Sequence, residues 1–236
     1  MGAGMGDSEW MDININEAIN LPLIYASGHG HIYKYGEHLA IKGNCWEREL
    51  DMMKLAGACS ITPRGRVLQH GQVVGIIMDL GHPINVTSLD LVARKNLMDQ
   101  IISLVDALHA EGIIHGDIKL ANILTAPDGS LRFCDFEGSQ IEGSAEPPED
   151  QTLNWISRER LMDLDSPLCK ADDYYALGMT VWEVFSGKVP FQGLEEDEVE
   201  KEILEGKSVD LTVISDQDAR DVISKYLTLG SRGLHA

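Results

Sequence analysis

The stretch that decides the fold reads Ile-His-Gly-Asp-Ile-Lys-Leu-Ala-Asn at residues 114–122, and Asp135 follows thirteen positions after its last residue. Between them, two short apolar runs flank Pro-Asp-Gly at residues 127–129. These three residue types favour tight turns, so the pattern predicts a β-hairpin. With the turn centred between the Asp and the Gly, antiparallel pairing places Asn122 opposite Asp135, roughly 5 Å apart.

The predicted hairpin gathers groups that suit a metal ion and a phosphate. Asp117 lies a few residues before Asn122 on the same edge, and Lys119 lies between them. Two oxygen ligands, a further carboxylate and an ammonium group then converge on one small volume. Oxygen ligands suit Mg²⁺, which proteins usually hold with one or two carboxylates and with substrate phosphates.

This arrangement resembles the catalytic core of the eukaryotic protein-kinase family. The family's H-R-D-x-K-x-x-N loop appears at residues 115–122, with glycine in place of the arginine, and its D-F-G appears as Asp-Phe-Glu at residues 135–137. The resemblance implies ATP and Mg²⁺ as cofactors. It also implies the roles of the residues: Asp117 takes the hydroxyl proton of the substrate, Lys119 faces the γ-phosphate, and Asn122 and Asp135 hold Mg²⁺.

The same resemblance implies an α+β fold of two lobes, a small β-rich N-lobe with one short helix and a mainly helical C-lobe. Residues 1–20 are polar and glycine-rich, and we expect them to be a loose lead-in. We expect residues 21–236 to form one protein kinase domain. Its parts are then an N-lobe (21–79), a hinge (79–83) and a C-lobe (84–236) with a shortened C-terminal part.

The predicted N-lobe contains stretches similar to the family's nucleotide-binding elements. Residues 21–35 read as strand, glycine-bearing turn and strand, with Ala26 at the first glycine position of a G-x-G-x-x-G-x-V loop. Leu-Ala-Ile-Lys at residues 39–42 resembles the family's V-A-I-K. The resemblance implies nucleotide contacts from these stretches, from the hinge and from the strand after the catalytic loop: Gly28, Gly30, Ile32, Ala40, Lys42, Met78, Asp79, Leu80 and Leu124.

A helix is predicted over residues 46–57, with a glycine as its last residue. Glu49 borders the apolar side of this helix, whereas Glu47 falls on the charged side. Glu49 is therefore the expected partner of Lys42, in the role of the glutamate on the family's αC helix. The apolar side comprises Trp46, Leu50 and Met53.

Two helices stand out in the predicted C-lobe. Residues 96–110 are amphipathic, and residues 171–187 are apolar nearly all round, which indicates a buried central helix. The latter resembles the family's αF, which implies that Asp173 braces the backbone of the catalytic loop. Glu159 resembles the glutamate of the family's A-P-E motif, and the resemblance leaves two arginines as its partner, Arg220 or Arg232.

Residues 137–152 form a long polar stretch that resembles the family's activation segment. Kinases regulated by phosphorylation of this segment usually bind the phosphate with the arginine before the catalytic aspartate. Glycine occupies that position here. We therefore predict that phosphorylation of Ser139, Ser144 or Thr152 is not required for activity.

The composition restricts the classes of molecule that the protein is expected to bind. The formal net charge of −19 argues against nucleic acid or an anionic membrane and favours basic protein segments. The four cysteines form no C-x-x-C pair, and no apolar run reaches the ~18 residues of a membrane helix. We therefore expect an intracellular, cytoplasmic protein that acts on a protein substrate, and the sequence makes no prediction of oligomeric state.

Three functions remain open, and the first is a serine/threonine protein kinase. Small-molecule kinases of the aminoglycoside or choline phosphotransferase type share the fold and also favour H-G-D and D-F-E. Lys119, two positions after Asp117, and Glu159 favour the protein kinase instead. A catalytically silent binding module is favoured by the degraded glycine loop and by Glu137. The combination of H-G-D with D-F-E is also similar to short kinase-like proteins of filamentous fungi.

Overall fold

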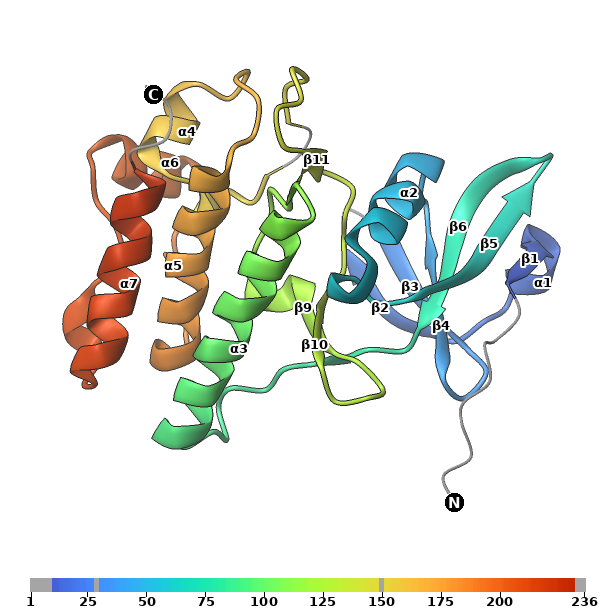
Figure 1. Cartoon of the computed structure of the whole chain (residues 1–236), viewed down its shortest axis with the longest axis horizontal. Helices are drawn as coiled ribbons and strands as arrows, with labels where there is room; N and C mark the ends of the chain where they lie inside the picture. The colour runs from blue at the N-terminus through green and yellow to red at the C-terminus, as the bar shows by residue number, and fades with distance from the viewer. Residues whose placement is uncertain (1–9, 28–29, 149–150, 232–236) are drawn as a thin grey trace. The chain divides into compact units, whose positions relative to one another are not determined.

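The computed structural model describes residues 10–27, 30–148 and 151–231. The chain forms two compact units: the first contains residues 1–82 and 125–137, and the second contains residues 83–124 and 138–236. Strands dominate the first unit and helices the second, which confirms the expected α+β fold (Figure 1). No helix in the described ranges is both long and apolar enough to cross a membrane.

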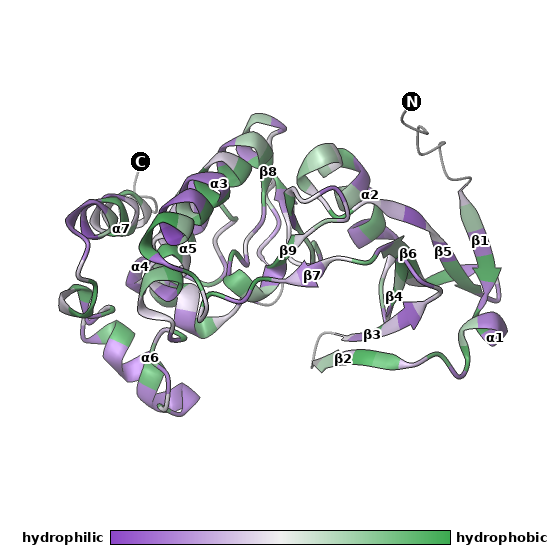
Figure 2. Ribbon diagram, turned by 90° about the horizontal axis from the view of Figure 1, so that it is seen from below, coloured by the Kyte–Doolittle hydropathy of each residue, from purple (hydrophilic) through white to green (hydrophobic). Residues whose placement is uncertain are grey.

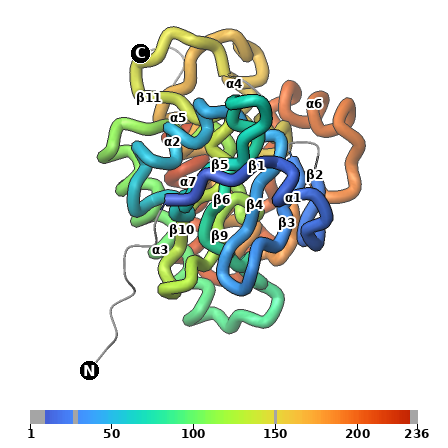
Figure 3. Tube along the Cα trace, turned by 90° about the vertical axis from the view of Figure 1, so that its right-hand side faces the viewer, coloured from blue at the N-terminus to red at the C-terminus, as the bar shows by residue number. Residues whose placement is uncertain are grey.

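A six-stranded sheet forms the first unit, with the strands in the order β1-β5-β6-β4-β3-β2. Figure 3 shows several of these strands crossing the unit side by side. Neighbouring strands are antiparallel, except that β1 is parallel to β5. The strands are β1 (Met11–Asn14), β2 (Leu23–Ser27), β3 (Gly30–Tyr35), β4 (Leu39–Gly43), β5 (Pro63–Gln69) and β6 (Gln72–Asp79).

The expected loose lead-in is wrong for the residues of β1 and α1 (Ile15–Ala18). Ile13 of β1 is buried in an apolar cluster with residues of β4, β5 and β6. Gly65 allows this pairing, because a Cβ there would lie 2.0 Å from the carbonyl oxygen of Met11. Asn14 then caps α1 in a reciprocal box with Glu17. The short strand β1 is thus ordered by its pairing with β5, because Gly65 leaves room for the backbone of Met11.

Helix α2 (Glu47–Ala56) occupies the predicted place and ends at Gly57, which has a positive φ of 52°. Leu50 and Met53 are buried on it, as predicted. The prediction was wrong for Trp46, which is 68% exposed. Trp46 is the extended residue before the helix, so its side chain does not follow the helical period.

The turn between β9 (Ile123–Thr125) and β10 (Leu131–Phe133) differs from the predicted one by one residue. Ala126 N–H donates to the carbonyl of Ser130 (2.8 Å), and Gly129 N–H donates to that of Ala126 (2.9 Å). Gly129 has a φ of 84°. This is a three-residue loop with a glycine bulge. The register at the turn is therefore shifted by one residue from the predicted register, and the approach of Asn122 to Asp135 stays a prediction.

The second unit is built around α5 (Lys170–Ser186), which packs against α7 (Gln217–Gly230) and α3 (Leu91–Ala110). The side chain of Leu227 lies 3.0 Å from where a Cβ at Gly178 would be, so the missing side chain lets α5 and α7 approach closely. Asp90 caps α3, which begins five residues before the predicted start. Figure 1 shows the three helices side by side.

The remaining elements of the second unit are short. Acidic side chains cover most of α6 (Glu196–Leu204), which is largely purple in Figure 2, while Val199 and Ile203 are buried. Strand β7 (His82–Pro83) lies where the chain passes from the first unit to the second. The others are α4 (Arg158–Met162), β8 (Ile113–Ile114), β11 (Gln140–Ile141), η2 (Leu120–Asn122), η3 (Leu153–Trp155) and η4 (Leu211–Val213), and in the first unit η1 (Gly57–Cys59).

Candidate active site

In the first unit, Lys42 of β4 lies between two carboxylates. Its Nζ donates to Oε1 of Glu49 (2.6 Å) and to Oδ1 of Asp135 (2.7 Å). Lys42 and Glu49 are 6% and 2% exposed. Burial by itself would lower the pKa of Lys42, but the two carboxylates outweigh it and hold the pKa above its usual value. The lysine is therefore a permanent buried cation, and sequence reasoning chose the correct glutamate for it.

Asp135 adopts a backbone conformation that few residues tolerate. Its φ is 64°, in the left-handed region, where aspartate is better accepted than most non-glycine residues. The N–H of Phe136, which is fully buried, donates to Glu49 Oε1 (3.2 Å). One carboxylate oxygen of Glu49 therefore binds both Lys42 and the backbone beside Asp135, which holds the strained residue in place.

Two of the residues predicted to contact nucleotide lie beside Lys42. Ile32 is opposite Lys42 across β3 and β4. A Cβ at Gly30 would lie 3.0 Å from the carbonyl oxygen of Gly43 and 3.5 Å from Cε of Lys42. The absence of a side chain at Gly30 thus lets β3 pass close to the lysine. Gly28 lies outside the described residues.

Ala40 and Met78 face each other across β4 and β6 and are 2% and 5% exposed. Leu124, another apolar residue of the predicted nucleotide set, is partly exposed on β9. Small and flexible apolar side chains of this kind can line a flat aromatic ligand. Their role in binding ATP stays a prediction.

The predicted hinge is expected to bind the adenine ring with its backbone at residues 79–81. Two of its backbone N–H groups already donate hydrogen bonds within the protein. Asp79 N–H donates to the carbonyl of Thr62 (3.0 Å), and Leu80 N–H donates to that of His38 (2.9 Å). The Asp79 carboxylate makes a two-pronged ion pair with Arg64 (2.7 and 3.0 Å). An adenine site at residues 79–81 would therefore depend on the carbonyl groups and on the N–H of the glycine.

In the second unit, the carboxylate of Asp117 is held on one side. Its Oδ2 accepts from Nζ of Lys119 (2.6 Å) and from Nδ2 of Asn122 (2.8 Å). The same Asn122 amide donates to the Asp117 carbonyl (2.9 Å). Oδ1 of Asp117 is buried and has no hydrogen-bond partner among the described residues. The structure thus brings together the three residues predicted to be catalytic and leaves one carboxylate oxygen available.

Asp173, at the start of α5, holds the backbone that leads to Asp117. It is fully buried, and its carboxylate accepts from the N–H groups of His115 (2.9 Å) and Gly116 (2.8 Å). The predicted bracing by Asp173 is therefore confirmed. His109 was not predicted to take part, yet its Nε2 lies 2.8 Å from the same carboxylate. Nothing in the helical pattern of α3 marked this histidine as a partner of Asp173.

Sequence reasoning also missed a contact that joins residues 138–157 to the catalytic loop. Lys119 Nζ donates to Oγ1 of Thr152 (2.6 Å) as well as to Asp117. Ser139 is fully buried and donates to the carbonyl of His115 (3.1 Å). Thr152 and Ser139 are two of the three residues considered as phosphorylation sites. Both hydroxyls instead make structural hydrogen bonds.

Sequence reasoning also missed a buried ion pair between α4 and α5. Arg160 is 1% exposed and makes a two-pronged pair with Asp172 of α5 (2.8 and 2.7 Å). The sequence had suggested Arg220 or Arg232 as the partner of Glu159. Arg220 instead donates to the carbonyl of Ile214 and to a glutamine side chain, and Arg232 lies outside the described residues. Twelve residues separate Arg160 from Asp172, so no helical or strand period revealed the pair.

A small cavity is lined in part by Asp117 and has room for about one water molecule (≈ 10 Å³). Gln151, Thr152 and Trp155 are among the residues that line it. Three polar atoms of lining residues are buried without a partner among the described residues: Asp117 Oδ1, Gln151 Oε1 and Trp155 Nε1. Asp117 therefore lines a cavity whose residues can accept a small polar group.

Glu183 of α5 is the titratable group with the most unusual pKa near the catalytic loop. Burial raises its pKa to about 7, although a backbone hydrogen bond from Leu120 and the charge of Lys119 oppose this. Glu183 Oε2 is buried without a partner in the described part of the chain. The charge beneath the catalytic loop therefore changes near neutral pH.

The donor chemistry fits a hard cation. Asp135 offers a carboxylate, and Asn122 can offer its amide oxygen because its Nδ2 donates to Asp117. No cluster of three or more His, Cys, Asp and Glu side chains that could hold a metal occurs within the described ranges. Oxygen donors of either kind suit Mg²⁺, which keeps several waters and uses one or two carboxylates with substrate phosphates. The binding of one Mg²⁺ ion by both Asn122 and Asp135 stays a prediction.

Comparison with known proteins places these features in a family. Residues 42–229 match the protein kinase domain. The chain is similar to the serine/threonine-protein kinase PDK1 of Cryptococcus neoformans (28% identity, 68% of this chain, 13% of that protein). It is also similar to sperm motility kinase 2B of Mus musculus (27%, 82% and 43%) and to the serine/threonine-protein kinase PknA of Mycobacterium tuberculosis (29%, 62% and 36%). It thus spans less than half the length of each of these relatives.

Proposed function

The chain belongs to the protein kinase family, and on that premise we propose that it transfers the γ-phosphoryl group of Mg-ATP to serine or threonine hydroxyls of a protein. The observation that carries the proposal is the state of Asp117. Lys119 and Asn122 occupy one oxygen of its carboxylate, while the other is buried without a partner in the described residues. A base in this position can accept the proton of an incoming hydroxyl.

The proposed reaction uses the chain's own groups as follows. The acceptor hydroxyl gives its proton to Asp117 as its oxygen forms a bond to the γ-phosphorus. The bond between that phosphorus and the oxygen of the departing ADP breaks. Lys119 stabilises the charge on the transferred group, because it is an ammonium beside the base. Mg²⁺, held by Asn122 and Asp135, would supply charge neutralisation at the phosphates.

Nucleotide binding is assigned mainly to the first unit. Lys42 is a buried, permanently charged ammonium group that can pair with the α/β-phosphates. Glu49 orients it. We propose that residues 79–83 act as the hinge of a single kinase domain over residues 21–236. The remaining nucleotide contacts are proposed for Gly28, Gly30, Ile32, Ala40, Met78, Asp79, Leu80 and Leu124.

A protein substrate follows from the family, and the net charge of −19 favours a basic segment around the acceptor residue. We propose an intracellular, cytoplasmic location, where ATP is abundant and the four free cysteines stay reduced. The family resemblance of Lys119 and Glu159 supports protein over small-molecule acceptors.

The experiment that tests nucleotide binding is a thermal-shift measurement with ATP, with and without Mg²⁺. Ligands that bind the folded state raise the melting temperature by mass action. We expect a magnesium-dependent rise that is lost in Asp135→Ala. Transfer of labelled phosphate to a mixture of basic proteins, with small hydroxyl compounds as competitors, then tests the acceptor class.

A silent binding module is the second candidate, because Glu137 places a negative side chain directly after Asp135-Phe136. This charge opposes the binding of Mg-ATP at Asp135. Absence of any thermal shift at millimolar ATP would favour this candidate and refute the proposed kinase activity.

A further inference from the structure

Residues 138–148 and 151–157, together named the loop segment below, contact the catalytic loop at more than one point. Thr152 of the loop segment accepts a hydrogen bond from Lys119 (2.6 Å), and Ser139 donates to the carbonyl of His115 (3.1 Å). Strand β11, within the segment, pairs with β8, directly before the catalytic loop. The position of the loop segment therefore influences the position of Asp117.

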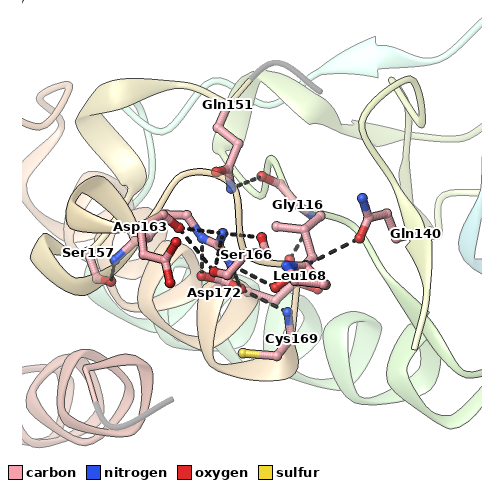
Figure 4. Close-up of polar contacts among 12 residues, drawn as sticks. Gly116, Gln140, Gln151, Ser157, Asp163, Ser166, Leu168, Cys169 and Asp172 are labelled. Carbon is pink, nitrogen blue, oxygen red and sulfur yellow. Dashed lines mark hydrogen bonds and ion pairs between the residues drawn. The ribbon is translucent and has the colours of Figure 1, made fainter. Parts of the chain in front are cut away.

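Gln140 is the buried centre of the loop segment. It is 2% exposed, and its Nε2 donates to the carbonyls of Glu146 and Pro147 (both 3.1 Å). Its Oε1 accepts from the N–H of Leu168 (3.2 Å), a contact drawn in Figure 4. The neutral amide of Gln140 thus links β11 to residues 146–147 of the loop segment and to Leu168, which precedes α5. A carboxylate could not replace it, because an ionised glutamate has no N–H to donate.

Leu168 connects Gln140 to the catalytic loop. A Cβ at Gly116 would lie 2.6 Å from Cδ1 of Leu168, so the leucine occupies the space that a side chain at Gly116 would need. The backbone of Gly116 is held on both sides: its N–H donates to Asp173 (2.8 Å) and its carbonyl accepts from Gln151 (3.3 Å). Figure 4 shows Gln151 pointing to Gly116 from above. Asp117 is the next residue.

The nearby guanidinium of Arg160 is fully occupied. Its Nε and Nη2 donate to Asp172, and its remaining N–H groups donate to the carbonyls of Asp163, Ser166 and Pro167. It is 1% exposed. This arginine is therefore committed to the structure and is not available to bind a phosphate on the loop segment. The side-chain amides of Gln140 and Gln151 instead make hydrogen bonds that hold the loop segment against its surroundings.

We propose that Gln140 is a positioning residue for the catalytic aspartate. It fixes Leu168 against Gly116 and fixes the loop segment that carries Thr152, so that Asp117 keeps its orientation without a phosphate group on the loop segment. This inference rests on the proposed phosphoryl transfer. It extends it by naming a residue, outside the catalytic loop, that sets the geometry of the base.

The test compares Gln140→Glu with the unchanged protein by hydrogen exchange and by kinetics. Gln140→Glu keeps the size of the side chain and its acceptor but loses both donated bonds. Gln217→Ala is the matched control, because Gln217 is an exposed amide on α7 that donates to Asp221 (2.7 Å). The acceptor protein is histone, used as a basic probe, with Mg-ATP as donor.

We expect faster exchange in Gln140→Glu at residues 142–148, at Leu168 and in the catalytic loop at residues 113–122. The kcat should fall between about 10- and 100-fold, since small displacements of catalytic groups have effects of this size. The KM for ATP should stay within about twofold, because Lys42 and Glu49 belong to the other unit. The control should change none of these quantities.

Unchanged exchange in the catalytic loop of Gln140→Glu would overturn the proposal, even if the variant were less stable. Faster exchange with an unchanged kcat would also overturn it, because Gln140 would then hold the loop segment without positioning Asp117. If the unchanged protein transfers no phosphate, the proposed function fails, and the exchange at residues 113–122 still decides the role of Gln140. Should Gln140→Glu not fold, Gln140→Met preserves the bulk and removes all three bonds.

Discussion

The two units hold their key groups by different physical means. In the first, Lys42 is almost fully buried and is neutralised by two carboxylates at 2.6 and 2.7 Å. In the second, Asp117 receives one ammonium and one neutral amide, and the surrounding backbone is held by Asp173 and by glutamine amides. Two ion pairs hold the first group, whereas a single ion pair, to Lys119, and hydrogen bonds to amide and backbone groups hold the second. Changes in the first unit should alter nucleotide affinity, and changes in the second should alter turnover.

The largest expected effect separates these two properties. Asp117→Asn removes the base but keeps the shape of the side chain, so turnover should fall by about 10²- to 10⁴-fold while Mg-ATP binding persists. Lys42→Met is the counterpart and should lose ATP affinity. Isothermal titration and initial rates measure both. If Asp117→Asn failed to bind nucleotide, the division of labour between the units would be wrong.

The next effect concerns the stability of the second unit. Arg160→Ala removes one partner of a buried ion pair and leaves Asp172 without its guanidinium. Breaking such pairs costs about 3–5 kcal/mol, so the melting temperature should fall sharply. Lys207→Ala, which breaks ion pairs on the exposed surface of the same unit, is the control and should have little effect. A similar loss in both variants would contradict the structural role of Arg160.

Glu183 makes the second unit sensitive to pH. Burial raises its pKa from 4.5 to about 7, so the folded state prefers the protonated form. The stability that this preference contributes is complete below pH 4.5 and is lost as the pH rises through 7. Glu183→Gln should therefore gain about 3 kcal/mol relative to the unchanged protein between pH 4 and pH 8. Urea unfolding at several pH values measures the difference, and parallel curves for the two proteins would exclude this role.

A smaller effect is expected for the contact between Gly116 and Leu168. Gly116 has a φ of 81°, and a Cβ there would meet the leucine side chain at 2.6 Å. Gly116→Ala should cost about 1–3 kcal/mol through strain and overpacking. In a Leu168→Ala background the packing part of this cost should disappear. A cost that is the same in both backgrounds would show that the leucine does not occupy the space of the missing side chain.

Ser144, the third residue considered as a phosphorylation site, tests whether the second unit needs a phosphate group for activity. Ser139 is fully buried and Thr152 bonds Lys119, so alanine at either position removes a structural hydrogen bond. Ser144 is partly exposed, and the hydrogen bond that its hydroxyl accepts is a local one from the N–H of Glu146 (3.3 Å), so its replacement disturbs the structure least. We expect Ser144→Ala, and protein treated with phosphatase, to retain activity.

Local patterns predicted the parts of the molecule that depend on nearby residues. The position of Glu49 on its helix followed from the helical period, and the structure places it against Lys42. The turn between β9 and β10 failed by one residue, because Pro-Asp-Gly allows both a two-residue and a three-residue loop. The predicted burial of Trp46 was wrong because the helix begins one residue later, at Glu47.

The sequence by itself indicated the family, the main helices and the residues of the catalytic loop, since each depends on spacing along a short stretch of chain. Only the tertiary structure decided the pair of Arg160 with Asp172, the strand β1 that Gly65 admits, and the links from Gln140 to Leu168 and from Leu168 to Gly116. These contacts join residues far apart in the chain. They depend on burial and on the space between packed elements, which no local period encodes.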